Sequence, residues 1–280
     1  MSTVQFTKDD LLGVAKAFSG TPRILAELTR LMRDSRAGLD EVSALLKRDA
    51  PLSARIIRIA NSASLAQSEP VSSIEAASQM IGVKEIHRIV GIMAIDRMGS
   101  DQIATFGLTR QQMRHNSMLV ALLMEELAEA AGEDAPTAYA IGLLRPFGIR
   151  AFDQLNVDSG GAERFDPAVH PDLGMWEFNT FGTTSPQATS VILDAWRFPA
   201  EISKAIRDHR RPEGRHLPLI HLLHIAARMA DKLGYGLPCE SAFWTDSEEI
   251  YRKAGVTHRD SKRQIDRAFV AFDRLCRAMA

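Results

Sequence analysis

The sequence predicts an all-α protein, and three observations support this prediction. Apolar residues recur at the three- and four-residue spacing of amphipathic helices along almost the whole chain. Alternation with a period of two, which is typical of half-buried strands, is scarce, and no segment is predicted to be a strand. Residues that start or stop helices, such as Ser, Thr, Pro and Gly, bound most of the periodic segments.

The expected helices follow one another through mostly short connections. Pro22, Pro51 and Pro218 each stand at a helix start, where the missing N–H and the fixed φ of proline are tolerated. Thr109 is predicted to cap a long helix that Gly132 ends. The helices are expected at about residues 21–32, 40–46, 51–61, 73–81, 83–98, 109–131, 136–144, 185–196, 199–208, 218–233, 247–253 and 259–279.

Two other segments stand out from this regular pattern. Residues 156–174 lack helical periodicity and are rich in glycine and proline, so we expect a loop there. The aromatic residues that follow, Trp176, Phe178 and Phe181, are expected to anchor the core rather than to form a stacking surface. The last helix carries apolar residues on one face and Arg and Lys on the other, so we expect it to pack on the domain or to bind a partner.

Length and composition are those of a globular protein with one large domain or two small ones. The chain has 280 residues, of which 45% are hydrophobic, and its formal net charge is −1. This balance gives no general attraction to nucleic acid, and no apolar run reaches the ~20 residues that span a bilayer. Cys239 and Cys276 form no metal or redox motif, and the polar N-terminal segment is unlike a signal peptide. We therefore expect a cytoplasmic protein without a membrane partner.

Common catalytic motifs are missing from the sequence. It contains no nucleophile elbow, no P-loop and no glycine motif for dinucleotides. His221 and His224 have the spacing of two zinc ligands on a helix, but their apolar surroundings favour histidines packed in or near the core. The basic segment at residues 209–216 is interpreted as a solvated loop, with an anion site as the alternative.

The most specific stretch begins at Asp49 and reads DAPLSARIIRIANSA. It resembles the Asp-Pro-x-Leu … Asn-Ser-Ala signature of the HDOD family, the HD-related output domains of bacterial signalling proteins, with Ala50 inserted. Residues 71–77, 80–90, 196–199 and 205–212 are similar to further motifs of that family, in the same order. The sequence is therefore identified as a member of the HDOD family over about residues 7–234. The signature positions are Asp49, Pro51, Leu52, Asn61 and Ser62.

The resemblance also implies a domain organisation. An N-terminal helical half, about residues 7–102, is expected to pack on a degenerate HD-like half, about residues 103–234. Residues 235–280 would then form a C-terminal helical extension. For Asn61 the residue type itself indicates a structural role rather than ligand contact, because Asn tolerates left-handed geometry and can end the helix of Pro51 while its amide bonds nearby backbone.

HD-type phosphohydrolases, to which the family is related, bind catalytic metals through an early His, a His-Asp pair, further His residues and a late Asp. In the segment GLLRPFG, Arg145 and Pro146 replace the His-Asp pair. Arg is a permanent cation and Pro has no side-chain donor atom, so neither binds a metal. The resemblance therefore implies a degenerate site with no metal, no cofactor and no catalytic residue. The positions that correspond to the HD site are His115, Arg145, Pro146, His209, Arg210 and Asp231.

Two functional interpretations follow from these patterns. The favoured one is a non-catalytic signalling module that acts through protein contacts; sensor or cyclic-dinucleotide proteins are partners implied by the resemblance only. The alternative is a sensor of a nucleotide or another phosphate-bearing ligand, or a residual HD-type phosphohydrolase. The balanced charge disfavours a nucleic-acid partner, and the sequence does not indicate an oligomeric state. Because guanidinium groups bind phosphate through paired hydrogen bonds, the expected anion-binding residues are Arg145, Arg210, Arg211 and Arg215.

Overall fold

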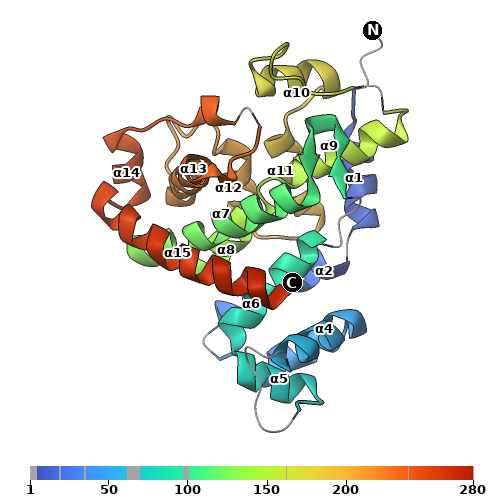
Figure 1. Cartoon of the computed structure of the whole chain (residues 1–280), viewed down its shortest axis with the longest axis vertical. Helices are drawn as coiled ribbons and strands as arrows, with labels where there is room; N and C mark the ends of the chain where they lie inside the picture. Colours follow the sequence, from blue (N-terminus) through green and yellow to red (C-terminus); the bar gives the residue numbers. More distant parts are fainter. Residues whose placement is uncertain are drawn as a thin grey trace.

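The computed structural model confirms the all-α prediction for the part of the chain that it describes, apart from one two-stranded sheet (Figure 1). Ser62 of the family signature and Cys239 lie outside the described residues. None of the described helices is both long enough and apolar enough to cross a membrane. The described residues are 5–18, 20–34, 36–61, 70–96, 101–161, 163–238 and 240–279.

Helices α2 to α6 build the N-terminal part of the fold, whereas α1 packs on α9 (Phe147–Asp158) and α11 (Ser185–Ala195). Helix α2 packs on α6, while the short helices α3 and α4 both pack on α5. Helices α4 and α5 lie at the lower end of the molecule in Figure 1, below α6. The bounds are α1 Lys8–Ala17, α2 Gly20–Met32, α3 Leu39–Leu46, α4 Ala50–Ala60, α5 Ile74–Ile81 and α6 Val83–Asp96.

Helix α4 explains how the signature sequence folds. The Asp49 carboxylate caps the helix by accepting a hydrogen bond from the Leu52 backbone N at 2.9 Å; Pro51 lies in the first turn and Leu52 is fully buried. Asn61 follows the helix as predicted, but its φ is −87°, so the expected left-handed geometry is wrong. Its amide Nδ2 donates to the Val71 carbonyl and its Oδ1 accepts from the Val71 N–H, both at 2.8 Å. Asn61 therefore ties the end of α4 to the residues that lead into α5.

The second part of the fold is organised around α7, on which α8, α13 and α15 pack. Thr109 caps α7 and Gly132 ends it, as predicted. Gly142 allows α8 to lie directly on α7, because a Cβ at this position would come within 2.7 Å of the Ala121 Cα. The elements are β1 Gln102–Ile103, η1 Ala104–Phe106, β2 Leu108–Thr109, α7 Arg110–Ala131, α8 Ala135–Leu144, α9 Phe147–Asp158, α10 Leu173–Phe181, α11 Ser185–Ala195, α12 Ala200–Asp208, α13 Pro218–Ala230, η2 Asp231–Tyr235 (a π-helical turn), η3 Ser241–Phe243, α14 Glu248–Ala254 and α15 His258–Met279.

The small sheet contradicts the expectation that the chain has no strand. Strands β1 and β2 are antiparallel, with Gln102 opposite Thr109 and Ile103 opposite Leu108. Each strand has only two residues, so neither can display the alternation by which strands are recognised in a sequence. The turn between them includes Gly107, which adopts a φ of 63°.

Three local expectations also need correction. The predicted loop at residues 156–174 is shorter, because α9 continues to Asp158 and α10 begins at Leu173. Helix α5 begins at Ile74, one residue later than expected, because Ser73 is its N-cap and the Ser73 hydroxyl accepts a hydrogen bond from the Ala76 backbone N–H. Trp176 and Phe181 are buried as core anchors, but Phe178 is 59% exposed because it lies on the outer face of α10.

Candidate functional site

The positions that correspond to the HD pair lie at the junction of α8 and α9. Arg145 follows α8 and Pro146 precedes α9, so the two helices meet at these residues. The Arg145 guanidinium is buried and donates from Nη1 to both carboxylate oxygens of Glu240, at 2.9 and 2.7 Å. Its Nη2 donates to the Asn116 side-chain oxygen on α7 at 2.6 Å. The position that the resemblance assigns to the metal-binding pair thus holds a cation that is bound to a carboxylate from residues beyond α13.

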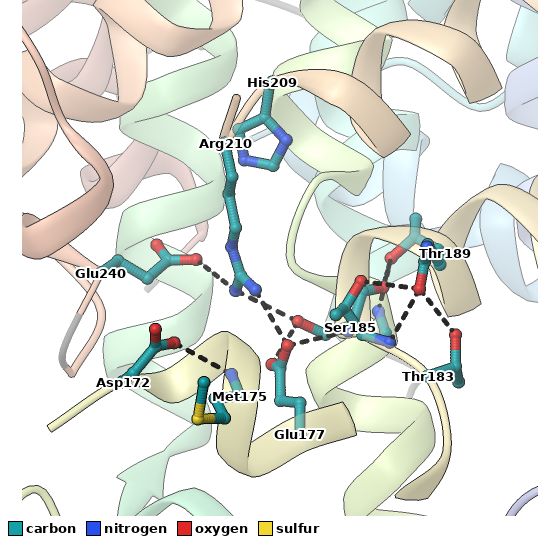
Figure 2. Close-up of polar contacts among 12 residues, drawn as sticks. Asp172, Met175, Glu177, Thr183, Ser185, Thr189, His209, Arg210 and Glu240 are labelled. Carbon is teal, nitrogen blue, oxygen red and sulfur yellow. Dashed lines mark hydrogen bonds and ion pairs between the residues drawn. The ribbon is translucent and has the colours of Figure 1, made fainter. Parts of the chain in front are cut away.

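Arg210, another of the positions that correspond to the HD site, binds the same carboxylate. Its Nη2 donates to Glu240 Oε1 at 3.0 Å, and its Nη1 donates to Glu177 Oε2 on α10 at 2.9 Å. Figure 2 shows the guanidinium between these two glutamates and beside Ser185. Ser185 in turn donates to Glu177 from its hydroxyl at 2.5 Å and from its backbone N at 3.0 Å. We call the series Arg145, Glu240, Arg210 and Glu177 the ion-pair chain.

The ion-pair chain is buried and electrically balanced. None of its four side chains is more than 9% exposed, and two positive charges alternate with two negative ones. Burial opposes ionisation of Glu240, but the two guanidinium groups outweigh it and hold the pKa of Glu240 below its ordinary value. Burial also opposes the charge of Arg210, and Glu177 and Glu240 outweigh it, so the pKa of Arg210 is raised.

Aromatic rings cover both guanidinium groups. The Trp244 ring centroid lies 5.9 Å from the Arg145 Cζ atom, and the Phe243 ring centroid lies 4.8 Å from the Arg210 Cζ atom. Both rings belong to the segment that supplies Glu240. This segment therefore contributes a carboxylate and an apolar cover to the site.

His209 lies buried next to the ion-pair chain. Its Nδ1 atom is 2.6 Å from the Ile206 carbonyl oxygen, and because a carbonyl only accepts, Nδ1 carries the proton. Burial, together with the charges of Arg145 and Arg210, holds the pKa of His209 well below its ordinary value of 6.5. The imidazole is therefore neutral at physiological pH.

The remaining HD positions do not complete a metal site. His115 on α7 is partly exposed and meets the Phe272 ring edge-on, with 5.6 Å between ring centroids. Asp231 begins η2, and burial together with the charge of Glu240 raises its pKa. In the described part of the chain, no three His, Cys, Asp or Glu side chains form a group that could hold a metal ion. The residues present do not fit a dinuclear metal centre.

Three of the four expected anion-binding residues, Arg210, Arg211 and Arg215, line a surface groove of about 680 Å³. The exposed side chains of Met175 and Phe178 line it as well. Arg145 does not line this groove, so the four arginines of the anion hypothesis do not share one cavity. Arg215 Nη2 lies 3.6 Å from a carboxylate oxygen of Asp208 in the same groove.

Sequence reasoning missed the two glutamates and Asn116. Glu177 carried no reliable signal, because consecutive residues of a helix face different directions and its neighbours Trp176 and Phe178 are buried and exposed, respectively. Glu240 lies in a segment with no helical periodicity, and no motif pointed to it. Its role is visible only in the folded chain.

Comparisons with known proteins agree with this architecture. The model of the HDOD domain family matches residues 19–212. The chain is similar to the crystal structure of a candidate signal-transduction protein from Marinobacter aquaeolei VT8, with a TM-score of 0.73 and 20% identity, over 96% of this chain and 64% of that one. It thus spans less than two thirds of the Marinobacter protein.

Two further crystal structures match the chain over almost their full length. An HDOD domain protein of unknown function from Geobacter sulfurreducens has a TM-score of 0.64 and 20% identity, over 94% of this chain and 96% of that one. A candidate phosphohydrolase from Shewanella amazonensis SB2B has a TM-score of 0.64 and 21% identity, over 92% of this chain and 93% of that one. No curated protein matches the sequence significantly. Identities this low show a shared fold only, and the family match, over more than half of the chain, establishes that the protein belongs to the HDOD domain family.

Proposed function

We propose that this chain is a non-catalytic regulatory module that acts through contacts with other signalling proteins. The observation that carries the proposal is the buried ion pair between Arg145 and Glu240. The family resemblance assigns the position of Arg145 to a metal-binding His of HD-type enzymes. A fixed cation repels a metal ion, and water activation of the HD type depends on that ion.

The ion-pair chain supports this proposal energetically. Removing one partner from a buried ion pair leaves an uncompensated charge, which costs about 3–5 kcal/mol. A metal ion that displaced Arg145 would leave the guanidinium without Glu240, so metal binding would have to overcome this cost as well as the repulsion. The buried ion pairs therefore favour retention of Arg145 and Arg210 over binding of a metal ion.

We further propose the organisation in which this module works. Residues 7–234 would form the HDOD domain, with halves at about 7–102 and 103–234, and residues 235–280 an extension. The extension supplies Glu240, Phe243 and Trp244 to the ion-pair chain and packs α15 along α7, so it would act as part of the regulatory unit. We place this unit in the cytoplasm, with sensor or cyclic-dinucleotide proteins as its class of partner.

Metal content and hydrolysis of a cyclic dinucleotide test the proposal directly. Purified full-length protein is expected to contain iron, manganese and zinc far below one atom per chain by inductively coupled plasma mass spectrometry. Incubation of the protein with cyclic di-GMP and added Mn²⁺ is expected to yield no linear product by chromatography, beside an active HD-type phosphodiesterase as positive control. Stoichiometric metal or product formation at a catalytic rate would overturn the proposal.

The same samples decide the alternative function, a sensor of a phosphate-bearing ligand. The groove that contains Arg211 favours this alternative, since no described carboxylate forms an ion pair with Arg211. Binding of cyclic di-GMP without turnover, weakened by Arg211→Ala, would replace the protein-contact proposal by the ligand-sensing one. Because Arg145 is buried against Glu240, Arg211→Ala tests ligand contact more directly than Arg145→Ala.

A further inference from the structure

A second group of arginines lies far in sequence from the ion-pair chain and has different surroundings. A groove of about 430 Å³ opens between α2, the residues after α3 and the turn that joins α11 to α12. We call it the arginine groove. The described residues that line it are Arg23, Ala26, Glu27, Arg30, Arg48, Trp196, Arg197 and Pro199.

The arginine groove has an excess of positive charge. Its four arginines face a single lining carboxylate, Glu27, which pairs with Arg48. None of the other three arginines forms an ion pair with a carboxylate of the described chain, and all three are exposed. Four arginines against one glutamate leave a local charge of +3, in a chain whose formal net charge is −1. Like charges held this close repel one another, and a bound anion would relieve that repulsion.

Arg197 also has an unusual backbone. It is the non-glycine residue with positive φ in the described chain, at 63°, and it directly follows the C-cap Trp196 of α11. The backbone N–H of Arg197 donates to Asp194, and that of Phe198 donates to Leu193 at 3.1 Å. This pattern of hydrogen bonds ends a helix with a left-handed residue, a place that glycine normally takes.

An arginine at such a position is informative. Left-handed geometry brings the Cβ of an L-residue too close to the backbone, so a glycine would fit better. Residues in sparsely populated backbone regions cluster at active sites and ligand-binding sites. Here the side chain belongs to the groove that already contains three other arginines.

We propose that the arginine groove binds a small ligand that carries at least two linked phosphate groups. Guanidinium groups bind phosphate oxygens through paired, charge-assisted hydrogen bonds, and the local charge of +3 matches the roughly three negative charges of a pyrophosphate group. The groove volume lies in the usual range of small-ligand sites. Because the groove joins α2 to the α11–α12 turn, the ligand contacts helices from both parts of the fold. This site is separate from the ion-pair chain and does not rest on the proposed function.

Isothermal titration calorimetry of the full chain with inorganic pyrophosphate tests this site. Wild-type protein is expected to show saturable binding with one ligand per chain. Arg197→Gly and Arg30→Ala should each weaken it by about tenfold or more, because each removes a charge-assisted contact. In contrast to a folding defect, Arg197→Gly should leave the thermal unfolding midpoint unchanged or raise it.

A matched control separates this site from general charge attraction. Arg36→Ala removes the same charge at a side chain that is 90% exposed, outside the groove and paired with Asp34. It should change the affinity by less than about twofold. Equal weakening by Arg36→Ala and Arg197→Gly, or the absence of saturable binding to wild type, would overturn the proposal. So would loss of binding in Arg211→Ala with Arg197→Gly unaffected, because the ligand would then occupy the groove beside the ion-pair chain.

A second titration identifies the source of the phosphates. If ADP binds about as tightly as pyrophosphate and is equally sensitive to Arg197→Gly, the groove recognises the linked phosphates themselves. If ADP binds about tenfold more tightly, the ligand is a nucleotide and the walls of the groove contact its base or sugar. Both outcomes support a diphosphate site. Metal content and hydrolysis are measured separately, so a failure here leaves the proposed function untouched.

Discussion

Arg145 and Arg210 lie beneath the surface and share the carboxylate of Glu240, whereas Arg197 and the other arginines of the arginine groove face solvent around one glutamate. Burial accounts for the difference. A charge removed from water must be paired inside the protein, but water and salt screen charges that stay at the surface. Arginine therefore has two different roles in this protein. The buried arginines are paired with carboxylates of the protein itself, and the exposed ones remain available to a ligand from outside.

Removal of Glu240 tests this contrast and should have the largest effect on the free energy of unfolding. Glu240→Ala leaves two buried guanidinium groups without their shared carboxylate, and we expect it to lower the free energy of unfolding by about 3–5 kcal/mol. Urea unfolding followed by circular dichroism measures this change. Glu240→Gln, which keeps the shape and one acceptor oxygen, should cost less.

An exposed glutamate of the same extension provides the control. Glu248 is 91% exposed, and Glu248→Ala should change the free energy of unfolding by less than about 0.5 kcal/mol. If Glu240→Ala cost no more than Glu248→Ala, the ion-pair chain would not stabilise the fold. The proposal that these ion pairs exclude a metal from the site would then lose its physical support.

Most of the fold was predictable because its signals are local. Asp49 and Pro51 start one helix and Thr109 and Gly132 bound another, and in each case the residues that decide the structure are neighbours in the sequence. Amphipathic periodicity marked most of the other helices in the same way. The two-residue strands escaped because they are too short to show a pattern.

For the site, the sequence supplied only a hypothesis, which rests on the family resemblance. The resemblance implies that Arg145 and Pro146 stand in place of a metal-binding pair, and neither residue type binds a metal. The partner of Arg145 did not follow, because Glu240 lies 95 residues further along the chain and is brought near it by tertiary packing, in which α13 lies on α7 and α8. Pairing of buried charges is decided by tertiary packing, and a single sequence does not contain that information in local form.

Acidic pH should lower the stability contributed by the buried region around the ion-pair chain, and not that of the exposed arginine groove. His209 is neutral in the folded state because its pKa is held well below 6.5, while the unfolded chain takes up a proton near that value. Its contribution is therefore complete above about pH 6.5 and is lost as the pH falls. At pH 5.5 we expect about 1.4 kcal/mol less stability from His209 than at pH 7.5.

His209→Asn tests this dependence, because Asn has no titrating group and can still donate to the Ile206 carbonyl. Urea unfolding at the two pH values should show a smaller loss in this variant than in wild type. Arg197→Gly serves as the control, since it retains every histidine and should lose as much as wild type. If His209→Asn lost as much stability at low pH as wild type, other groups would cause the acid sensitivity. His87 is such a group, because burial lowers its pKa to about 3.

The smallest expected effect concerns the backbone of Arg197. Left-handed geometry costs a non-glycine residue about 1–2 kcal/mol, and Arg197→Gly removes this cost. Glycine also gives the unfolded chain more conformational freedom, which offsets about 0.5–1 kcal/mol of the gain. Arg197→Gly should therefore stabilise the protein by about 0.5 kcal/mol. Arg197→Ala removes the same charge but keeps the Cβ, and it should be less stable than the glycine variant by a similar amount. If both variants gained equally, relief of charge repulsion would explain the gain and the backbone would carry no strain. The backbone of Arg197 would then no longer indicate that its side chain is retained for ligand binding. Only the positive charge of the arginine groove would support a ligand there.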